Sequence, residues 1–354
     1  MATSFHSGFL ILVLAIFFLV QTTTTSSTAT STSMHSGGLE TLIVAQDGSG
    51  NFTKIGDAIS FAPNNSNYRT IIKVKAGIYY EYLEIPENKP NLMLYGEGSN
   101  VTEIRGNRSV GDGCKTLYSA TVAVLGQGFI ARDISFINTA GASKNQAVAL
   151  RVDADMAAFY RCAIDGYQDT LYARLGHQFY RECDISGTVD FIFGDATAVF
   201  QMCNIYVKLP ASGQSNTITA QGRKDEDDIR GFSLQNCSIL PSQELAASNV
   251  SVKTFLGRPW KTYAVTVYIK SYLDSIVDPS GWMKWSDGDD PAMYKVYYGE
   301  YANYGPGKGT QDTRINWPGF HWMEYEEARN FSVSRFIKGD EWLPSTSIPF
   351  DDGI

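Results

Sequence analysis

The hydrophobic positions in the middle of the chain recur in a repeating segment. Three copies, Ala158–Asp165, Gln178–Ser186 and Val199–Tyr206, follow each other with a period of 21 and then 20 residues between their cysteines. Fainter copies begin at Phe129 and Phe232. Each copy alternates apolar and polar residues over five or six positions, which predicts a strand with one buried face. Short strands repeated at this spacing indicate a parallel β-helix or another solenoid.

Helical patterns are scarce, and the best short candidates are Phe52–Ala62 and Glu326–Asn330. Repetitive all-β folds can reach the length of this chain, 354 residues, as one unit. We therefore expect an all-β fold with a few short helices and one large domain over residues 41–354.

The cysteines of the repeat are expected in the core. Cys162, Cys183 and Cys203 occupy equivalent places, which predicts a stacked column of small buried side chains on adjacent turns of the coil. A disulfide between two of them stays open. The chain has five cysteines and no C-x-x-C pair, so at least one thiol is free and a zinc site is not expected.

The N-terminal segment has the pattern of a targeting sequence. Phe9–Val20 is apolar without a break, too short to span a bilayer but suited to the core of a signal peptide, so we assign residues 1–25 to a signal peptide. Membrane anchoring is the alternative. Residues 26–40 are rich in Ser and Thr and are expected to form a linker.

Glycosylation sequons agree with a secreted glycoprotein. Seven Asn-x-Ser/Thr triplets occur, at Asn51, Asn64, Asn100, Asn107, Asn236, Asn249 and Asn330. The formal charge of −8 falls entirely after residue 38. Such an acidic domain argues against a nucleic-acid partner, and it predicts weak electrostatic retention on a polyanionic matrix.

The repeat also aligns candidate catalytic groups. Asp169 follows Cys162 by seven residues and Asp190 follows Cys183 by seven, so both occupy the same phase of successive turns. Gln146 lies 23 residues before Asp169, close to one further turn. Neighbouring strands lie about 4.8 Å apart, so these polar groups are expected to form a column on one outer face. Two adjacent carboxylates suit acid and nucleophile roles, but the pattern alone does not separate an esterase from a glycosidase.

Five ordered motifs decide between these chemistries. The chain from Thr41 onward resembles the plant pectin methylesterase (pectinesterase) family in its signature segments. These are Gly77–Glu81, Gln146–Leu150, Gly166–Tyr172, Asp190–Gly194 and Leu256–Trp260, and the likeness extends to Thr217–Arg223, Gly281–Trp285 and Trp317–Phe320.

The resemblance implies a right-handed parallel β-helix with a shallow cleft, and an enzyme that hydrolyses the methyl esters of homogalacturonan to de-esterified pectin and methanol. Asp190 would attack the ester carbonyl, and Asp169 would protonate the methoxide and then act as base on water. Gln146 and Gln168 would donate hydrogen bonds to the oxyanion. Arg258 would keep Asp190 ionised and oriented, as well as contacting substrate.

For substrate binding, the resemblance implies an aromatic face from Trp260 and contacts from Thr116 and Gln146. It implies no metal or cofactor, a monomer in the cell wall without membrane attachment after signal cleavage, and a proteinaceous pectinesterase inhibitor as a partner. Two departures concern substrate pattern and charge preference: Cys114 replaces a common Trp, and Lys224–Asp228 is unusually acidic. The residues before Thr41 are too few for the inhibitor-like domain of many relatives, so a form without it is expected.

Two rival functions remain at this stage. One is a β-helical polysaccharide depolymerase, either a hydrolase or a calcium-dependent lyase, which would yield reducing ends or unsaturated products but no methanol. The other is a catalytically inactive protein that binds carbohydrate or an inhibitor on the same scaffold. The presence of both aspartates, both glutamines and Arg258 together argues against the second.

Overall fold

Three parallel β-sheets run the length of the coil in the computed structural model, which describes Met1 and residues 40–354 except 287 and 289. The segment Leu39–Ile354 forms one compact unit. The predicted signal peptide at 1–25 and linker at 26–40 lie, apart from Met1 and Glu40, outside the described residues and stay predictions.

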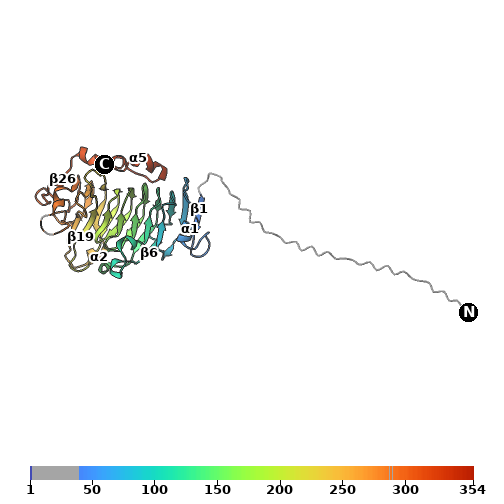
Figure 1. The fold of residues 1–354 in the computed structure, drawn as a ribbon. Coiled ribbons are helices and arrows are strands. Elements are labelled where there is room, and N and C mark those ends of the chain that lie inside the picture. The colour runs from blue at the N-terminus through green and yellow to red at the C-terminus, as the bar shows by residue number, and fades with distance from the viewer. Residues whose placement is uncertain (2–39, 287, 289) are drawn as a thin grey trace. The chain divides into compact units, whose positions relative to one another are not determined.

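The chain winds from sheet A to sheet B to sheet C and back, with one strand per sheet in each turn of the coil from β2 to β22 (Figure 1). Sheet A consists of β1 (Glu40–Val44), β2 (Thr70–Val74), β5 (Leu92–Tyr95), β8 (Ile130–Arg132), β11 (Ala157–Tyr160), β14 (His177–Arg181), β17 (Thr197–Gln201), β20 (Gly231–Gln235), β23 (Val265–Ile269), β25 (Tyr297–Tyr301) and β26 (Phe320–Trp322).

Sheets B and C are shorter. Sheet B consists of β3 (Gly77–Tyr79), β6 (Thr102–Gly106), β9 (Ser135–Asn138), β12 (Ala163–Asp165), β15 (Asp184–Gly187), β18 (Asn204–Val207), β21 (Ser238–Pro241) and β24 (Tyr272–Leu273). Sheet C consists of β4 (Leu83–Ile85), β7 (Val122–Val124), β10 (Leu150–Val152), β13 (Leu171–Ala173), β16 (Val189–Gly194), β19 (Asn216–Gln221) and β22 (Thr254–Gly257). The predicted all-β parallel β-helix is confirmed.

The interior is a set of columns because equivalent residues stack from one turn of the coil to the next. The rings of Phe159, Tyr180 and Phe200 stack with centroids 4.9 and 4.6 Å apart. The repeat cysteines form a second column, joined by Cys237, and each is at most 1% exposed. All five cysteines are free thiols. The predicted cysteine column is confirmed. Each fully buried large apolar side chain in these columns stabilises the fold by about 1.5–3 kcal/mol of transfer free energy.

Each repeated segment forms two strands where the sequence pattern predicted one. The chain turns from sheet A to sheet B at a single residue in the left-handed conformation, at Arg161, Glu182, Met202 and Asn236, with φ between 50° and 55°. Three of these are neither Gly nor Asn, so the turn carries no sequence signal. The stacked strands on both sides hold this conformation in place. The alternation of apolar and polar residues continues through the corner, which is why the sequence pattern predicted one strand.

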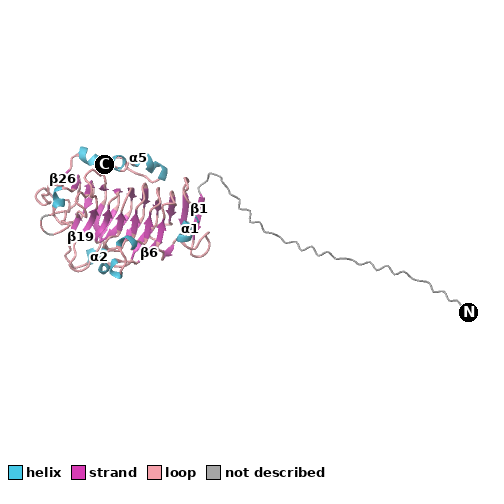
Figure 2. Ribbon diagram, in the orientation of Figure 1, coloured by secondary structure: helices cyan, strands magenta, loops and turns pink. Residues whose placement is uncertain are grey.

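The helices lie outside the sheets (Figure 2). They are α1 (Ile55–Phe61), α2 (Gln243–Ala247), α3 (Tyr325–Ala328), α4 (Val333–Phe336) and α5 (Gly339–Trp342), with 3-10 turns η1 (Val110–Asp112), η2 (Thr116–Tyr118), η3 (Ala142–Lys144), η4 (Pro291–Tyr294), η5 (Arg329–Phe331) and η6 (Leu343–Thr346). Both short helices expected from the sequence are present, as α1 and as α3 with η5. Within the described residues, none of these helices has the length and apolar character to cross a membrane.

Candidate active site

The loops that lead from sheet B to sheet C carry the candidate site. On successive turns of the coil these loops bring Thr116, Gln146 and Asp169 to the outer face of sheet C, where they line a cleft of about 420 Å³ together with Asp190, the second residue of β16. Strands β13 and β16 pair Leu171 with Ile192, and the same register sets Asp169 beside Asp190. The column expected from the phase of the repeat is therefore present.

Asp190 is held by two partners. Arg258, just after β22, donates from Nε to Oδ1 at 2.8 Å and from the terminal nitrogen to Oδ2 at 2.7 Å. Thr217 donates its hydroxyl to Oδ1 at 2.7 Å and accepts from the Asp190 backbone N–H at 2.9 Å. A bidentate guanidinium pair fixes the plane of a carboxylate. The Asp190 carboxylate is thus oriented toward the cleft before any substrate arrives.

The backbone at both aspartates has an unusual conformation. Asp169 has φ 62° and Asp190 has φ 52°, in the left-handed region that non-glycine residues seldom occupy. Pairing between β16 and β19 is also irregular from Val189 to Ile192, around Asp190. Bulges of this kind redirect a side chain beside active sites, and such strain costs of order 1 kcal/mol or more per residue. The cost is offset by the pairing of the surrounding strands.

Asp169 lies in a different environment from Asp190. Both side chains are buried, with Asp169 7% and Asp190 5% exposed, but the Arg258 guanidinium pairs with Asp190. Burial raises the pKa of the Asp169 carboxyl well above its usual range, the neighbouring Asp190 carboxylate raises it further, and Arg258 lowers it in part. Two carboxyls placed side by side with only one paired to a guanidinium favour one shared proton on the unpaired group.

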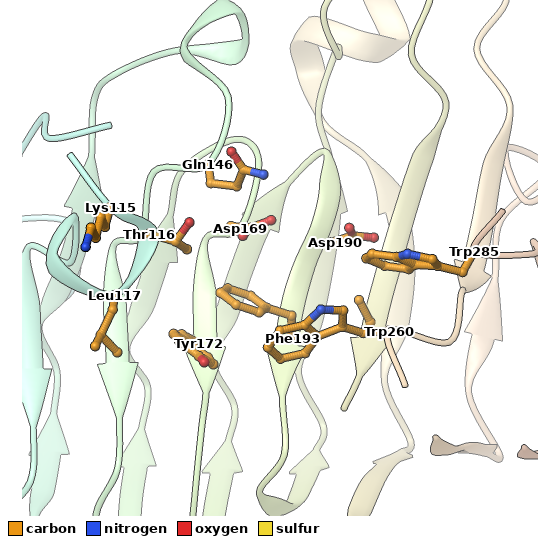
Figure 3. Close-up of a pocket in the computed structure, with 11 residues that line it drawn as sticks. Lys115, Thr116, Leu117, Gln146, Asp169, Tyr172, Asp190, Phe193, Trp260 and Trp285 are labelled. Atoms are coloured by element: carbon orange, nitrogen blue, oxygen red, sulfur yellow. The ribbon is translucent and has the colours of Figure 1, made fainter. Parts of the chain in front are cut away.

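Aromatic rings form the wall below the carboxylates (Figure 3). Tyr172 and Phe193 stack at 4.2 Å, and Trp260 meets both rings edge-on at 6.3 and 5.9 Å. The indole of Trp260 lies against the backbone of Gly222, where an added Cβ would stand 2.7 Å from a ring carbon. Gly222 is therefore required for this close approach. Trp285 closes the far side, with its ring 4.5 Å from the Arg258 guanidinium carbon.

The two glutamines differ in position. Gln146 lines the cleft, on the opposite side of the carboxylates from the aromatic wall in Figure 3. Gln168 precedes Asp169 on the next turn and is half-buried, but it is outside the set of residues that line the cleft. The Gln168 carbonyl accepts a hydrogen bond from the Ala147 N–H at 3.1 Å, which ties the two glutamine-bearing turns together.

A buried arginine supports the loop that carries Thr116. Arg151, on the outer face of β10 and 7% exposed, donates to the Leu117 carbonyl oxygen at 2.8 Å. It also pairs with Asp153 at 3.2 Å. Because Lys115, Thr116 and Leu117 all line the cleft, this contact fixes one edge of the site.

Sequence reasoning placed most of the site together but did not single out four of its residues. Tyr172 and Phe193 are 21 residues apart, the same spacing as the two aspartates, so the repeat could have indicated them. Thr217 and Trp285 lie within recognised motifs, yet no spacing relates them to Asp190. Among the described residues, no group of three or more His, Cys, Asp or Glu side chains could hold a metal ion.

Fold and site together define a class of protein. The molecule is a parallel β-helix with a carboxyl pair in an aromatic-lined surface cleft. Aromatic rings can stack on a saccharide ring, and a carboxyl pair can act as acid and nucleophile on a substituent of that ring. The pectinesterase family model matches residues 41–340. The chain belongs to the pectinesterase family, as the motifs indicated.

Individual relatives agree with this assignment. The chain is 58% identical over 315 residues to the probable pectinesterase/pectinesterase inhibitor 12 of Arabidopsis thaliana, an alignment that covers 89% of this chain and 57% of that protein. The chain therefore spans just over half the length of this curated relative. The structure of the pectin methylesterase from carrot matches with a TM-score of 0.87 and 45% identity, over 90% of this chain and 98% of that one.

A fungal structure shares the fold at lower identity. The pectin methylesterase from Aspergillus niger matches with a TM-score of 0.74 and 33% identity, over 87% of this chain and 97% of that one. With the carrot structure, this match supports the right-handed parallel β-helix expected for the family.

Proposed function

We propose that this chain is a pectin methylesterase, which hydrolyses the methyl esters of homogalacturonan to free carboxylates and methanol. The observation that carries the proposal is the environment of the two aspartates. Both are buried and line the cleft, but Asp190 is fixed by Arg258, whereas burial and the neighbouring carboxylate raise the pKa of Asp169. The carrot relative is named as a pectin methylesterase, which supports the same reaction.

In the first half of the reaction Asp190 acts as nucleophile. One carboxylate oxygen attacks the methyl-ester carbonyl carbon, and the carbonyl electron pair moves to oxygen. When the tetrahedral intermediate collapses, the bond to the methoxy oxygen breaks and Asp169 transfers its proton to that oxygen. Methanol leaves, and the galacturonate acyl group stays on Asp190 as an anhydride.

In the second half Asp169, now ionised, accepts a proton from water. The water oxygen attacks the acyl carbon, and the bond to Asp190 breaks. The product is a galacturonate carboxyl, and Asp169 has regained its proton. Gln146 lines the cleft where the oxyanion forms, and Gln168 on the next turn is assigned the second amide donor.

Substrate contacts and surroundings complete the proposal. Trp260 would stack on a sugar ring and Thr116 would contact the chain on the other edge of the cleft. The signal-type N-terminus and the sequons support a secreted glycoprotein, which we propose to act as a monomer in the cell wall. A proteinaceous pectinesterase inhibitor would be its protein partner. No step uses a metal or cofactor.

Methanol release from highly methylated pectin by the full chain, expressed in a secretory host, tests the proposal. Asp190→Asn should reduce turnover by about 10³-fold or more while the circular dichroism spectrum stays that of the wild type. Asp184→Asn is the matched control, since Asp184 is exposed and lies on β15 in the same turn of the coil. An active Asp190→Asn enzyme would overturn the nucleophile. Reducing ends or unsaturated products without methanol would indicate a depolymerase.

A further inference from the structure

A row of alternating cationic and aromatic side chains runs along the outer face of sheet A, away from the cleft on sheet C. Strand register places these residues opposite one another on consecutive strands. In order from β2 to β14 the members of this cation–aromatic row are Lys73, Tyr95, Arg132, Tyr160 and Arg181.

The rings and cations of the row are in contact. The Arg132 guanidinium carbon lies 5.5 Å from the Tyr95 ring centroid and 5.1 Å from that of Tyr160. The Arg161 guanidinium carbon lies over the Tyr160 ring, 4.9 Å from its centroid. The row is thus pre-ordered, with cations about 9–10 Å apart on every second strand.

The C-terminal segment shows what this row can bind. At its far end the Arg181 guanidinium donates to the Asp351 carboxylate at 2.8 Å, and Gln201 on the next strand donates to the Asp351 backbone carbonyl at 2.9 Å. A C-terminal segment of the same chain thus places a carboxylate on the row. Toward β2 the row continues beyond this segment.

At its β2 end the row borders a groove of about 580 Å³, lined by Lys73, Lys75, Tyr95, Glu97, Asp133 and Arg161. Lys75 pairs with Glu97 at 2.9 Å, but both side chains are about half exposed, so the pair is weak. Asp133 is shared by Arg132 and Arg161.

Lys73 has no ion-pair partner among the residues that the structure describes. Three cations, Lys73, Lys75 and Arg161, therefore line this groove together with two carboxylates, a local excess of positive charge on a chain of formal charge −8.

We propose that this groove is a second, non-catalytic binding site for unesterified galacturonan. Lys73, Lys75 and Arg161 would pair with successive carboxylates, and Tyr95 would lie against a sugar ring. The choice of galacturonate rests on the proposed function, since this polymer is the product of the cleft. A polymer held at both faces gains an effective concentration that can raise overall affinity by about 10²–10⁴-fold. The groove would keep the enzyme on segments that it has already de-esterified.

Calorimetric titration of the full chain with unesterified hexagalacturonate at low ionic strength tests this site. The wild type should bind two molecules, one in the cleft and one in the groove. Lys73→Gln/Lys75→Gln should bind one, and should bind long polygalacturonate at least about tenfold more weakly. Lys54→Gln/Lys308→Gln is the matched control, because it removes the same charge from exposed lysines elsewhere and should bind two.

The remaining outcomes are also decisive. A single site in the wild type, or equal loss in both double variants, would overturn the groove. Tyr95→Ala should weaken hexagalacturonate binding in the groove but leave polyglutamate binding unchanged. Equal loss for both polymers would show that the groove is a non-specific charged patch, and it would contradict the proposal. Methanol release from short methylated oligogalacturonides should be unchanged in all of these variants. If the wild type releases no methanol, the proposed function fails separately.

Discussion

The outer faces of sheets A and C both carry apolar side chains on consecutive parallel strands, but their surroundings differ. On sheet A the outward residues Ile130, Ala158, Phe179 and Val199 form an apolar strip that is covered by the C-terminal helices. On sheet C the outward rings of Tyr172 and Phe193 pack against Trp260 in the aromatic wall of the cleft. The outward apolar residues of sheet A are thus covered by another segment, whereas those of sheet C line an open cleft.

The comparison teaches that strand alternation alone does not assign an outward aromatic residue to a role. Trp342 packs into the cover of sheet A and is 7% exposed, whereas Trp260 is only partly buried above sheet C. Substitutions on sheet A should therefore change the free energy of unfolding, and those on sheet C should change kinetics.

The largest effect is expected from Trp342→Ala. It removes a buried indole whose N–H donates to the Ile337 carbonyl oxygen at 3.0 Å. We expect the free energy of unfolding to fall by about 3–5 kcal/mol, with kcat per folded molecule unchanged. Denaturant titration and methanol release measure the two quantities. A large loss of kcat at full folding would break the distinction between the faces.

The next effect concerns Arg258→Lys. Lysine keeps the charge but cannot form the two parallel hydrogen bonds to Asp190. We expect kcat to fall by about 10–100-fold, with little change in the free energy of unfolding. Steady-state kinetics and thermal melting measure this pair of effects. A wild-type kcat would show that orientation of Asp190 does not limit the reaction.

A smaller effect is expected from Trp260→Ala. Loss of the stacking surface should raise KM by about 5–10-fold, corresponding to about 1–1.4 kcal/mol, with kcat changed less. Trp342→Ala is the matched control on the other face and should leave KM unchanged. Equal KM values in both variants would remove the binding role of the aromatic wall.

The smallest effect is a pH dependence of stability from Asp169. Its pKa is higher in the folded state than in the unfolded chain, chiefly because of burial. The folded state therefore retains the proton to higher pH, so this group weakens the fold as pH rises from the ordinary carboxyl range through the raised pKa. Asp169→Asn should melt at a higher temperature than wild type above that range.

The deprotonation of Asp169 should also make kcat/KM fall at alkaline pH. As the proposed general acid, Asp169 must carry its proton, so kcat/KM should decline as pH rises through the raised pKa. Two results would contradict the proton assigned to this residue. One is that Asp169→Asn and wild type melt at the same temperature at all pH values, and the other is a kcat/KM that does not decline at alkaline pH.

Much of the architecture was accessible from the sequence. The period of the repeat predicted the coil and the cysteine column, and the shared phase of Asp169 and Asp190 predicted their juxtaposition. These features follow from local order, because stacking in a parallel solenoid relates residues one period apart. The longer excursions between β18 and β21 and after β21 break that period, so spacing could not relate Arg258 or Thr217 to Asp190.

The sequence by itself determined the coil, its buried columns and the line of polar groups along one edge, because each depends on a spacing of about one turn. Only the tertiary structure decided which outer face stays open, how Arg258, Thr217 and Trp285 converge around Asp190, and that Asp169 is buried beside it. Those properties depend on segments far apart in the chain. Burial and charge at a given atom are set by everything packed around it, and no local pattern records that sum.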